Sequence, residues 1–155
     1  MSAVIAVLVG LTVGVSSALL PLVNAEVYAA AATARHPWAV ILVVVALAVG
    51  QTGGKVLLFE AARRGTRRFR AGPRLQALTS GTWADRVQRA LSERRTARPL
   101  VLTSAAIGLP PLALVTVAAG AAGQPVRGFA VLCFIGRTAR FSAIAVPVLI
   151  AVTSS

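Results

Sequence analysis

Two arginines interrupt an apolar run near the C-terminal end of the chain. The run extends from Phe129 to Val152, and as a helix it measures about 36 Å, which is enough to cross a bilayer. Arg137 and Arg140 lie near its middle, where a charged side chain costs on the order of 3 kcal/mol by insertion scales. Because they are three residues apart, both point to the same side of a helix. We therefore expect this side to face a bundle interior, a cavity or a partner.

The composition places the chain among small integral membrane proteins. Of its 155 residues, 57% are hydrophobic, and the mean hydropathy is +0.80, which is too apolar for an ordinary soluble domain and too short for more than one unit. Sixteen Lys and Arg oppose four Asp and Glu, and most of the basic residues lie between Arg63 and Arg98. Apolar segments flank this basic segment on both sides, which is the pattern of a cytoplasmic loop.

The sequence lacks the residues that several classes of function need. The basic segment contains only Phe69 and Trp83 as aromatic residues, too few for base stacking, so we expect no nucleic-acid partner. One His and one Cys cannot build a protein cage for a metal. The sequence also has no arrangement of nucleophile, base and acid, so we expect neither an enzyme nor a cofactor. Cys133 is expected to pack as a small hydrophobic side chain.

The first third of the chain has the pattern of a re-entrant hairpin. An apolar stretch, 3–20, ends at Pro21, and a second apolar stretch, 25–34, is only about three turns long and too short to cross a bilayer. Asn24 and Glu26 lie at the elbow between them. A cleavable signal peptide is disfavoured because no Lys or Arg precedes the apolar stretch. Backbone groups freed at the elbow need protein or water as partners, so the hairpin cannot face lipid alone.

The same pattern returns in the last third of the chain. A second elbow falls at Pro110 and Pro111, and another apolar arm of about three turns follows it. A full span then follows each hairpin, at 38–59 in the first half and 129–152 in the second. The sequence therefore predicts two copies of a unit made of a hairpin and a span.

The predicted fold is an all-α integral membrane domain with an inverted repeat. The first repeat covers 1–62, the basic cytoplasmic loop 63–98, and the second repeat 99–155. With the loop in the cytoplasm, the two spans cross in opposite directions, and Arg127 falls on the cytoplasmic side. Inverted repeats whose broken helices meet in the middle of the bilayer are a plan of secondary transporters.

Small residues at four-residue spacing predict close helix packing. Within the first span, Gly50 and Gly54 are expected to let a neighbouring helix approach, and Gly136 is assigned the same role in the second span. In the first apolar stretch Gly10 and Gly14 have this spacing. A non-transporting membrane scaffold, which is the competing interpretation, is expected to oligomerise through these two.

Six polar residues are predicted to lie together where the two hairpins meet. Glu26 is the only carboxylate among them. A buried carboxylate that faces two arginines stays ionised, whereas one that loses them takes up a proton. An anion competing for the arginines therefore gives a route to proton coupling, and the alternative is that Glu26 only neutralises an arginine and holds the repeats together. The set consists of Asn24, Glu26, Gln51, Thr52, Arg137 and Arg140.

Three expectations concern the periphery. Lys55 is expected either to turn inward with Gln51 and Thr52 or to pair with Glu60 near the cytoplasmic end of the first span. An amphipathic stretch, 82–91, is expected either to lie on the membrane surface or to form a solvated linker helix. His36 is expected to be an interfacial residue.

Several short motifs, in this order and spacing, resemble the DedA superfamily, also called SNARE-associated or VTT-domain proteins. The small bacterial YqaA-type branch is the most similar. The resemblance covers nearly the whole chain except the basic loop. The motifs are 20–27 (LPLVNAEV), 36–38 (HPW), 50–54, the Pro110–Pro111 elbow and 136–141 (GRTARF).

The resemblance implies two facing re-entrant hairpins in the bacterial cytoplasmic membrane and a role in moving lipids across it. It implies an anionic lipid substrate, undecaprenyl phosphate or a phospholipid, and dependence on proton motive force. The membrane carboxylate of the family is matched by Glu26, and its arginine pair by Arg137 and Arg140. Leu22 stands where the family has a glycine after the elbow proline, and a second membrane acid has no counterpart. A small-solute exporter remains a third alternative.

Overall fold

The regular structure of the described residues is entirely helical, as the sequence predicts. The computed structural model describes residues 3–19, 24–68, 86, 89–91 and 93–154. In chain order the helices are α1 (Ala3–Leu19), α2 (Ala25–Arg35), the short 3₁₀ helix η1 (Pro37–Ala39), α3 (Val40–Arg68), α6 (Arg94–Ile107), α7 (Leu112–Ala121) and α8 (Val126–Thr153).

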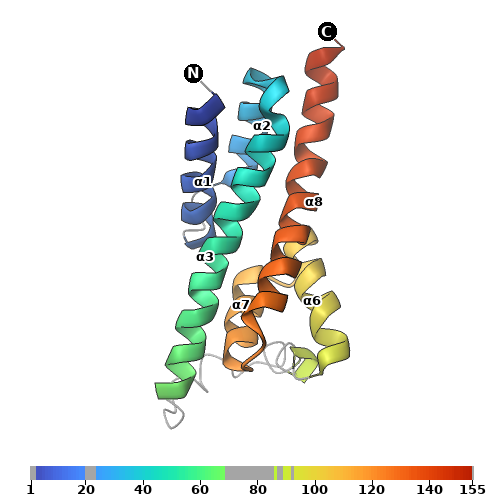
Figure 1. The fold of residues 1–155 in the computed structure, drawn as a ribbon. Helices are drawn as coiled ribbons and strands as arrows, with labels where there is room; N and C mark the ends of the chain where they lie inside the picture. The colour runs from blue at the N-terminus through green and yellow to red at the C-terminus, as the bar shows by residue number, and fades with distance from the viewer. Residues whose placement is uncertain (1–2, 20–23, 69–85, 87–88, 92, 155) are drawn as a thin grey trace.

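Two long helices, α3 and α8, form the axis of the molecule. They contain 29 and 28 residues, or about 42 Å each, and the segments Pro37–Gly65 and Val126–Thr153 are long and apolar enough to cross a membrane. The helices pack against each other and run in opposite directions (Figure 1). Helix α3 continues beyond the predicted end of its span, because Glu60 pairs with arginines three and four residues later and so supports another two turns.

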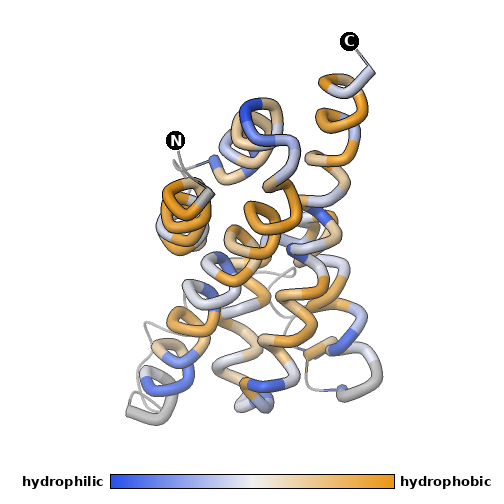
Figure 2. The backbone as a smooth tube through the Cα atoms, turned by 45° about the horizontal axis from the view of Figure 1, so that its top comes forward, coloured by the Kyte–Doolittle hydropathy of each residue, from blue (hydrophilic) through white to orange (hydrophobic). Residues whose placement is uncertain are grey.

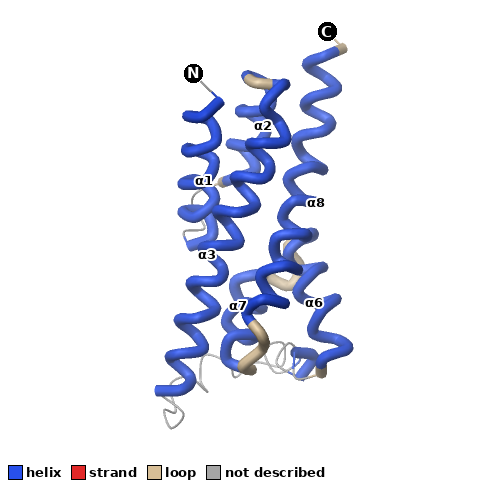
Figure 3. The backbone as a smooth tube through the Cα atoms, viewed as in Figure 1, coloured by secondary structure: helices blue, strands red, loops and turns tan. Residues whose placement is uncertain are grey.

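Two pairs of short helices lie beside opposite halves of this axis. Helices α1 and α2 lie along the half that contains the chain termini, and α6 and α7 lie along the other half (Figures 1 and 3). Helix α2 has 11 residues and α7 has 10, so each is about 15 Å long, half the thickness of a bilayer core. The elbow at Pro21 and most of the predicted amphipathic stretch, 82–91, lie outside the described residues.

Glycines bring α1 into backbone contact with α3. A Cβ atom on Gly14 would lie 2.8 Å from the carbonyl oxygen of Leu47 and 3.0 Å from the Cα of Gly50. A Cβ atom on Gly54 would lie 2.5 Å from the Cβ of Ala18, so α1 and α3 approach too closely for a side chain there. Gly10 faces α2 and α3 of its own chain and Gly14 faces α3, so both lie in contacts within one chain, and an oligomer through them stays a prediction.

A similar contact joins α6 to α8 in the other half of the molecule. A Cβ atom on Gly136 would lie 2.5 Å from the Cβ of Ala105. Helix α7 approaches α3 in the same way, because a Cβ atom on Gly120 would clash with the carbonyl oxygen of Phe59. Gly120 has no glycine four residues away, so the four-residue spacing does not reveal it.

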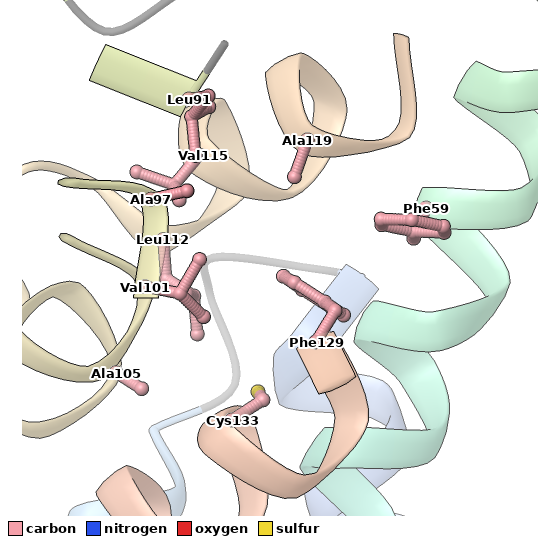
Figure 4. Close-up of a cluster of buried hydrophobic side chains, with 10 residues drawn as sticks. All are labelled: Phe59, Leu91, Ala97, Val101, Ala105, Leu112, Val115, Ala119, Phe129 and Cys133. Atoms are coloured by element: carbon pink, nitrogen blue, oxygen red, sulfur yellow. The ribbon is translucent and has the colours of Figure 1, made fainter. Parts of the chain in front are cut away.

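Two apolar clusters form the core, one in each half. The termini-side cluster is built on α2, α3 and α8, and the elbow-side cluster on α6, α7 and the opposite ends of the long helices. In the second cluster the rings of Phe59 and Phe129 stack with their centroids 4.9 Å apart (Figure 4). The termini-side cluster consists of Ala6, Ala25, Ala29, Ala32, Val43, Val44, Leu47, Ala48, Phe141 and Ala145. The elbow-side cluster consists of Phe59, Leu91, Ala97, Val101, Ala105, Leu112, Val115, Ala119, Phe129 and Cys133.

A candidate anion site between the two hairpins

A layer of polar side chains separates the two apolar clusters. On α3 the layer falls between Ala48 and Phe59, and on α8 it falls between Cys133 and Phe141. Because α3 and α8 are antiparallel, these two stretches meet near the middle of the molecule. The start of α2 and the end of α6 lie at the same level, because Glu26 and Ile107 both contact Arg140. The layer contains Glu26, Gln51, Thr52, Lys55, Ser104, Arg137, Thr138 and Arg140.

Arg140 joins the two hairpins. Its Nε and Nη2 atoms lie 2.6 and 2.5 Å from Oε1 of Glu26, at the start of α2. Its Nη1 atom donates to the carbonyl oxygen of Ile107, at the end of α6, over 2.7 Å. This end is shaped by Gly108, whose φ of 91° places it in the left-handed region. We call this arrangement, formed by Glu26, Arg140 and the Ile107–Gly108 segment, the clasp.

Local sequence explains why the carboxylate stands at this position. Asn24 caps α2, and its Oδ1 atom accepts hydrogen bonds from the backbone N–H groups of Glu26, over 3.0 Å, and of Val27, over 3.4 Å. An acid in the first turn is stabilised by the positive end of the helix dipole. Asn24 is exposed, so its side chain orders the helix start and belongs to the site only through Glu26.

Ser104, which the sequence did not single out as a site residue, holds the second elbow at Pro110. Ser104 is fully buried, and its hydroxyl group donates to the carbonyl oxygen of Pro110. Pro111 is the N-cap residue of α7, and Ile107 and Leu109 on the same elbow remain exposed. A signal for Ser104 exists in the sequence, because a serine precedes the elbow proline by a few residues in both halves.

Arg137 lies beside the clasp without a partner of its own. Its Nε atom is buried and has no hydrogen-bond partner among the described residues, and the ion pairs found there do not include it. Arg137 interacts electrostatically with Glu26 and Arg140 on one side and with Lys55 of α3 on the other. The structure thus brings Arg137 close to Glu26 but gives the direct ion pair to Arg140.

Lys55 is also in this layer, which corrects one expectation. Its side chain is buried, and Nζ donates to the carbonyl oxygen of Ala18, near the end of α1, over 2.8 Å. It does not pair with Glu60, which instead lies 3.5 Å from Arg63 and 3.9 Å from Arg64. The predicted pair is wrong because a five-residue separation places two side chains on different faces of a helix, whereas three or four residues place them together.

The two other predicted residues of α3 also point inward. Gln51 donates from Nε2 to the hydroxyl oxygen of Ser17 on α1 over 2.6 Å, and its Oε1 atom is buried with no hydrogen-bond partner among the described residues. Thr52 is buried and lies against the thiol group of Cys133. Both residues line the contact of α3 with its neighbours, and neither touches the clasp.

The charges in the layer do not balance. Lys55, Arg137 and Arg140 are cationic, and Glu26 is the only described carboxylate that pairs with any of them. A guanidinium group is planar and suits a phosphate or carboxylate group. The described residues contain no group of three or more His, Cys, Asp or Glu side chains. What the layer can do chemically is bind an anion.

Comparison of the chain with protein-family models, with curated proteins and with solved structures gives no match.

Proposed function

We propose that this chain is a membrane protein that moves an anionic lipid between the two leaflets of a bilayer. The observation that carries the proposal is the buried Nε–H group of Arg137, which has no partner among the described residues and lies near the partly exposed Glu26–Arg140 pair. An unpaired cation inside a membrane is costly and marks a substrate or ion pathway. The resemblance to the DedA superfamily supports the same function.

The outer surface of the helices supports a membrane environment. A soluble protein hides its long apolar helices in the core, but only 28% of the apolar window of α8 is buried. Large hydrophobic side chains are exposed along both long helices, for example Ile41, Val49 and Ile135. An apolar surface of this extent is stable in contact with lipid tails.

The direction of the helices supports the inverted repeat. Helix α1 packs on α3 as α6 packs on α8, and α7 packs on α3 as α2 packs on α8. Each helix of the first half runs opposite to its counterpart in the second (Figure 1). In the proposed orientation the end that carries Arg63, Arg64 and Arg127 faces the cytoplasm, in agreement with the positive-inside rule. Hydrophilic positions gather at this end of α3 and α8 (Figure 2).

The clasp suggests how binding of the anion is coupled to a proton. The side chain of Glu26 is 39% exposed and that of Arg140 is 26% exposed, so the pair is accessible from outside the bundle. An anionic head group that binds Arg137 and Arg140 displaces Glu26. The released carboxylate is then neutralised by a proton, because the membrane interior disfavours its charge. Protonation of Glu26 and binding of the anion therefore favour each other, and proton motive force drives the exchange.

Translocation in reconstituted vesicles tests the proposal. The full chain is incorporated into vesicles that contain a trace of fluorescent phosphatidylglycerol, and the label in the outer leaflet is bleached with an impermeant reductant. The parent protein is expected to make more than half of the label accessible, whereas Arg137→Gln slows this at least tenfold. The control is Arg127→Gln, which removes an exposed arginine from the same helix.

The outcomes separate the alternatives. A membrane scaffold leaves the label as protected as in protein-free vesicles. A small-solute exporter also leaves the lipid protected, but it releases an entrapped fluorescent anion. If Arg137→Gln and Arg140→Ala move lipid as fast as the parent protein, the proposed site is wrong.

A further inference from the structure

Lys55 and Arg137 extend from the clasp into the bundle as a second pair of cations. Lys55 is on α3 and Arg137 is on α8, two helices that pack against each other, and the two side chains are close enough to interact electrostatically. Only 7% of the Lys55 residue is exposed. Two like charges at this depth repel each other, and neither has a carboxylate partner among the described residues.

Helix ends do not supply the missing negative charge. The C-terminal ends of α1 and α6 approach the layer through Ala18 and Ile107, and each contributes about half a negative charge. The N-terminal ends of α2 and α7 lie at the same elbows and contribute about half a positive charge each. Counted with equal weight, these four contributions cancel. The side chains Lys55, Arg137 and Arg140 against Glu26 then leave two positive charges for a ligand to neutralise.

Within the described part of the chain, donors without an acceptor lie on both helices. The ammonium group of Lys55 has three protons, of which the carbonyl group of Ala18 takes one. The Nε–H group of Arg137 is buried and finds no partner among the described residues, and the same holds for the hydroxyl group of Thr138. A phosphate group with a single ester bond carries close to two negative charges near neutral pH and has three acceptor oxygens. A phosphate with two ester bonds carries only one negative charge.

We propose that Lys55 and Arg137 form the head-group site of the transported lipid and select a phosphomonoester over a phosphodiester. Lys55 is the residue that sets this preference, because it supplies the second charge that only a dianion can use. The inference rests on the proposed lipid transport. It is tested by the ratio of the transport rates of two lipids and not by the presence of transport alone.

The competing explanation is that Lys55 only caps the end of α1. A cation near the last carbonyl groups of a helix is stabilising whether or not an anion binds. Lys55→Gln keeps a hydrogen-bond donor for Ala18 and removes the charge, and Lys55→Arg keeps the charge. The two variants therefore separate the role of the donor from the role of the charge.

The experiment compares two labelled lipids with identical acyl chains, phosphatidic acid and phosphatidylglycerol, in vesicles that contain the full chain. The parent protein is expected to move phosphatidic acid about tenfold faster or more, since one charge-assisted hydrogen bond contributes at least this factor. Lys55→Gln is expected to bring the ratio of the two rates close to one while phosphatidylglycerol still moves. Lys55→Arg keeps the parent ratio. An unchanged ratio in Lys55→Gln, or a parent ratio near one, overturns the inference and leaves the proposed transport intact.

A binding measurement on the detergent-purified protein separates lipid from free phosphate. Its ligands are dihexanoyl phosphatidic acid, dihexanoyl phosphatidylglycerol and inorganic phosphate, each tested for a rise in the unfolding temperature. In the parent protein we expect the largest rise in unfolding temperature with dihexanoyl phosphatidic acid. In Lys55→Gln we expect the rises with dihexanoyl phosphatidic acid and dihexanoyl phosphatidylglycerol to be equal. An equal rise with inorganic phosphate at the same concentration overturns the assignment to a lipid. If the parent protein binds phosphatidic acid selectively but moves no lipid, the head-group site stands and the proposed transport fails.

Discussion

In each half of the molecule, a cation from the long helix donates to a carbonyl group at the end of the first hairpin helix. Lys55 of α3 does so at Ala18 of α1, and Arg140 of α8 does so at Ile107 of α6. The halves differ in what else these cations meet. Arg140 also holds Glu26, whereas no described carboxylate pairs with Lys55.

This difference between Lys55 and Arg140 distinguishes the part of each cation that the fold requires from the part that serves the proposed function. The free carbonyl groups at a helix end need donors when the end is buried away from water, so a cation at each elbow follows from ending a helix there. The architecture requires no carboxylate. Glu26 therefore gives a removable partner to Arg140 but not to Lys55, and we propose that the unbalanced charge of Lys55 is what an anion uses. Three changes test this comparison, from the largest expected effect to the smallest.

The contact of α1 with α3 is expected to be the most sensitive feature of the first half. In Gly50→Ala the new Cβ atom would clash with the carbonyl oxygen of Leu11, and the overpacking costs about 3 kcal/mol. The control is Gly53→Ala, three residues away on the same helix, where the added atom meets nothing within 4 Å. Thermal unfolding in detergent measures both variants. Equal unfolding temperatures for the two would show that α1 does not pack on α3 through Gly50.

The clasp is expected to couple Glu26 and Arg140 but not Glu26 and Lys55. A double-mutant cycle with Glu26→Gln and Arg140→Gln is expected to give a coupling free energy of about 2 kcal/mol, because the pair is a charge-assisted hydrogen bond that is only partly exposed. In the matched cycle, Lys55→Gln takes the place of Arg140→Gln, because Lys55 is the counterpart of Arg140 in the other half of the molecule. A coupling of Glu26 to Lys55 as large as its coupling to Arg140 would contradict the asymmetry between the elbows.

The end of α6 gives the smallest expected difference. Gly108→Ala and Gly123→Ala both place a side chain at a positive φ, which costs about 1 to 2 kcal/mol in each. Only the Cβ atom at position 108 would meet Arg140, at 2.8 Å from Nη1. The first variant is therefore expected to lose more stability, by about 1 kcal/mol, and the excess should vanish in an Arg140→Gln background. An excess that persists in that background would mean that Arg140 does not reach the elbow.

Much of the fold is predictable because the signals are local. The length of an apolar run and the position of a proline predict the two long helices and the two short ones, and the structure confirms that the described chain is all-helical. The residues at which the helices end are less predictable. Helix α3 extends to Arg68 because of the Glu60 pairs, and these depend on helix geometry beyond the apolar run.

The candidate site is predictable only in part, because it depends on which faces meet. Charge within an apolar run singles out Arg137, Arg140 and Glu26 without any structure. Sequence alone cannot decide which arginine takes the carboxylate, since both point to the same side of α8. The sequence leaves Lys55 between a pair with Glu60 near the cytoplasmic end and an inward position, because its partner in the structure, Ala18, lies on another helix.

The central claim is that the polar layer lies inside a bilayer between two halves of opposite orientation. Single cysteines introduced in a Cys133→Ala background test it directly, two at the basic end (Arg64→Cys and Arg127→Cys) and two at the termini end (His36→Cys and Ser154→Cys). An impermeant maleimide applied to intact cells or oriented vesicles is predicted to label the first two from one side and the last two from the other. Labelling of all four from the same side would contradict the account, because α3 and α8 would then not cross the membrane.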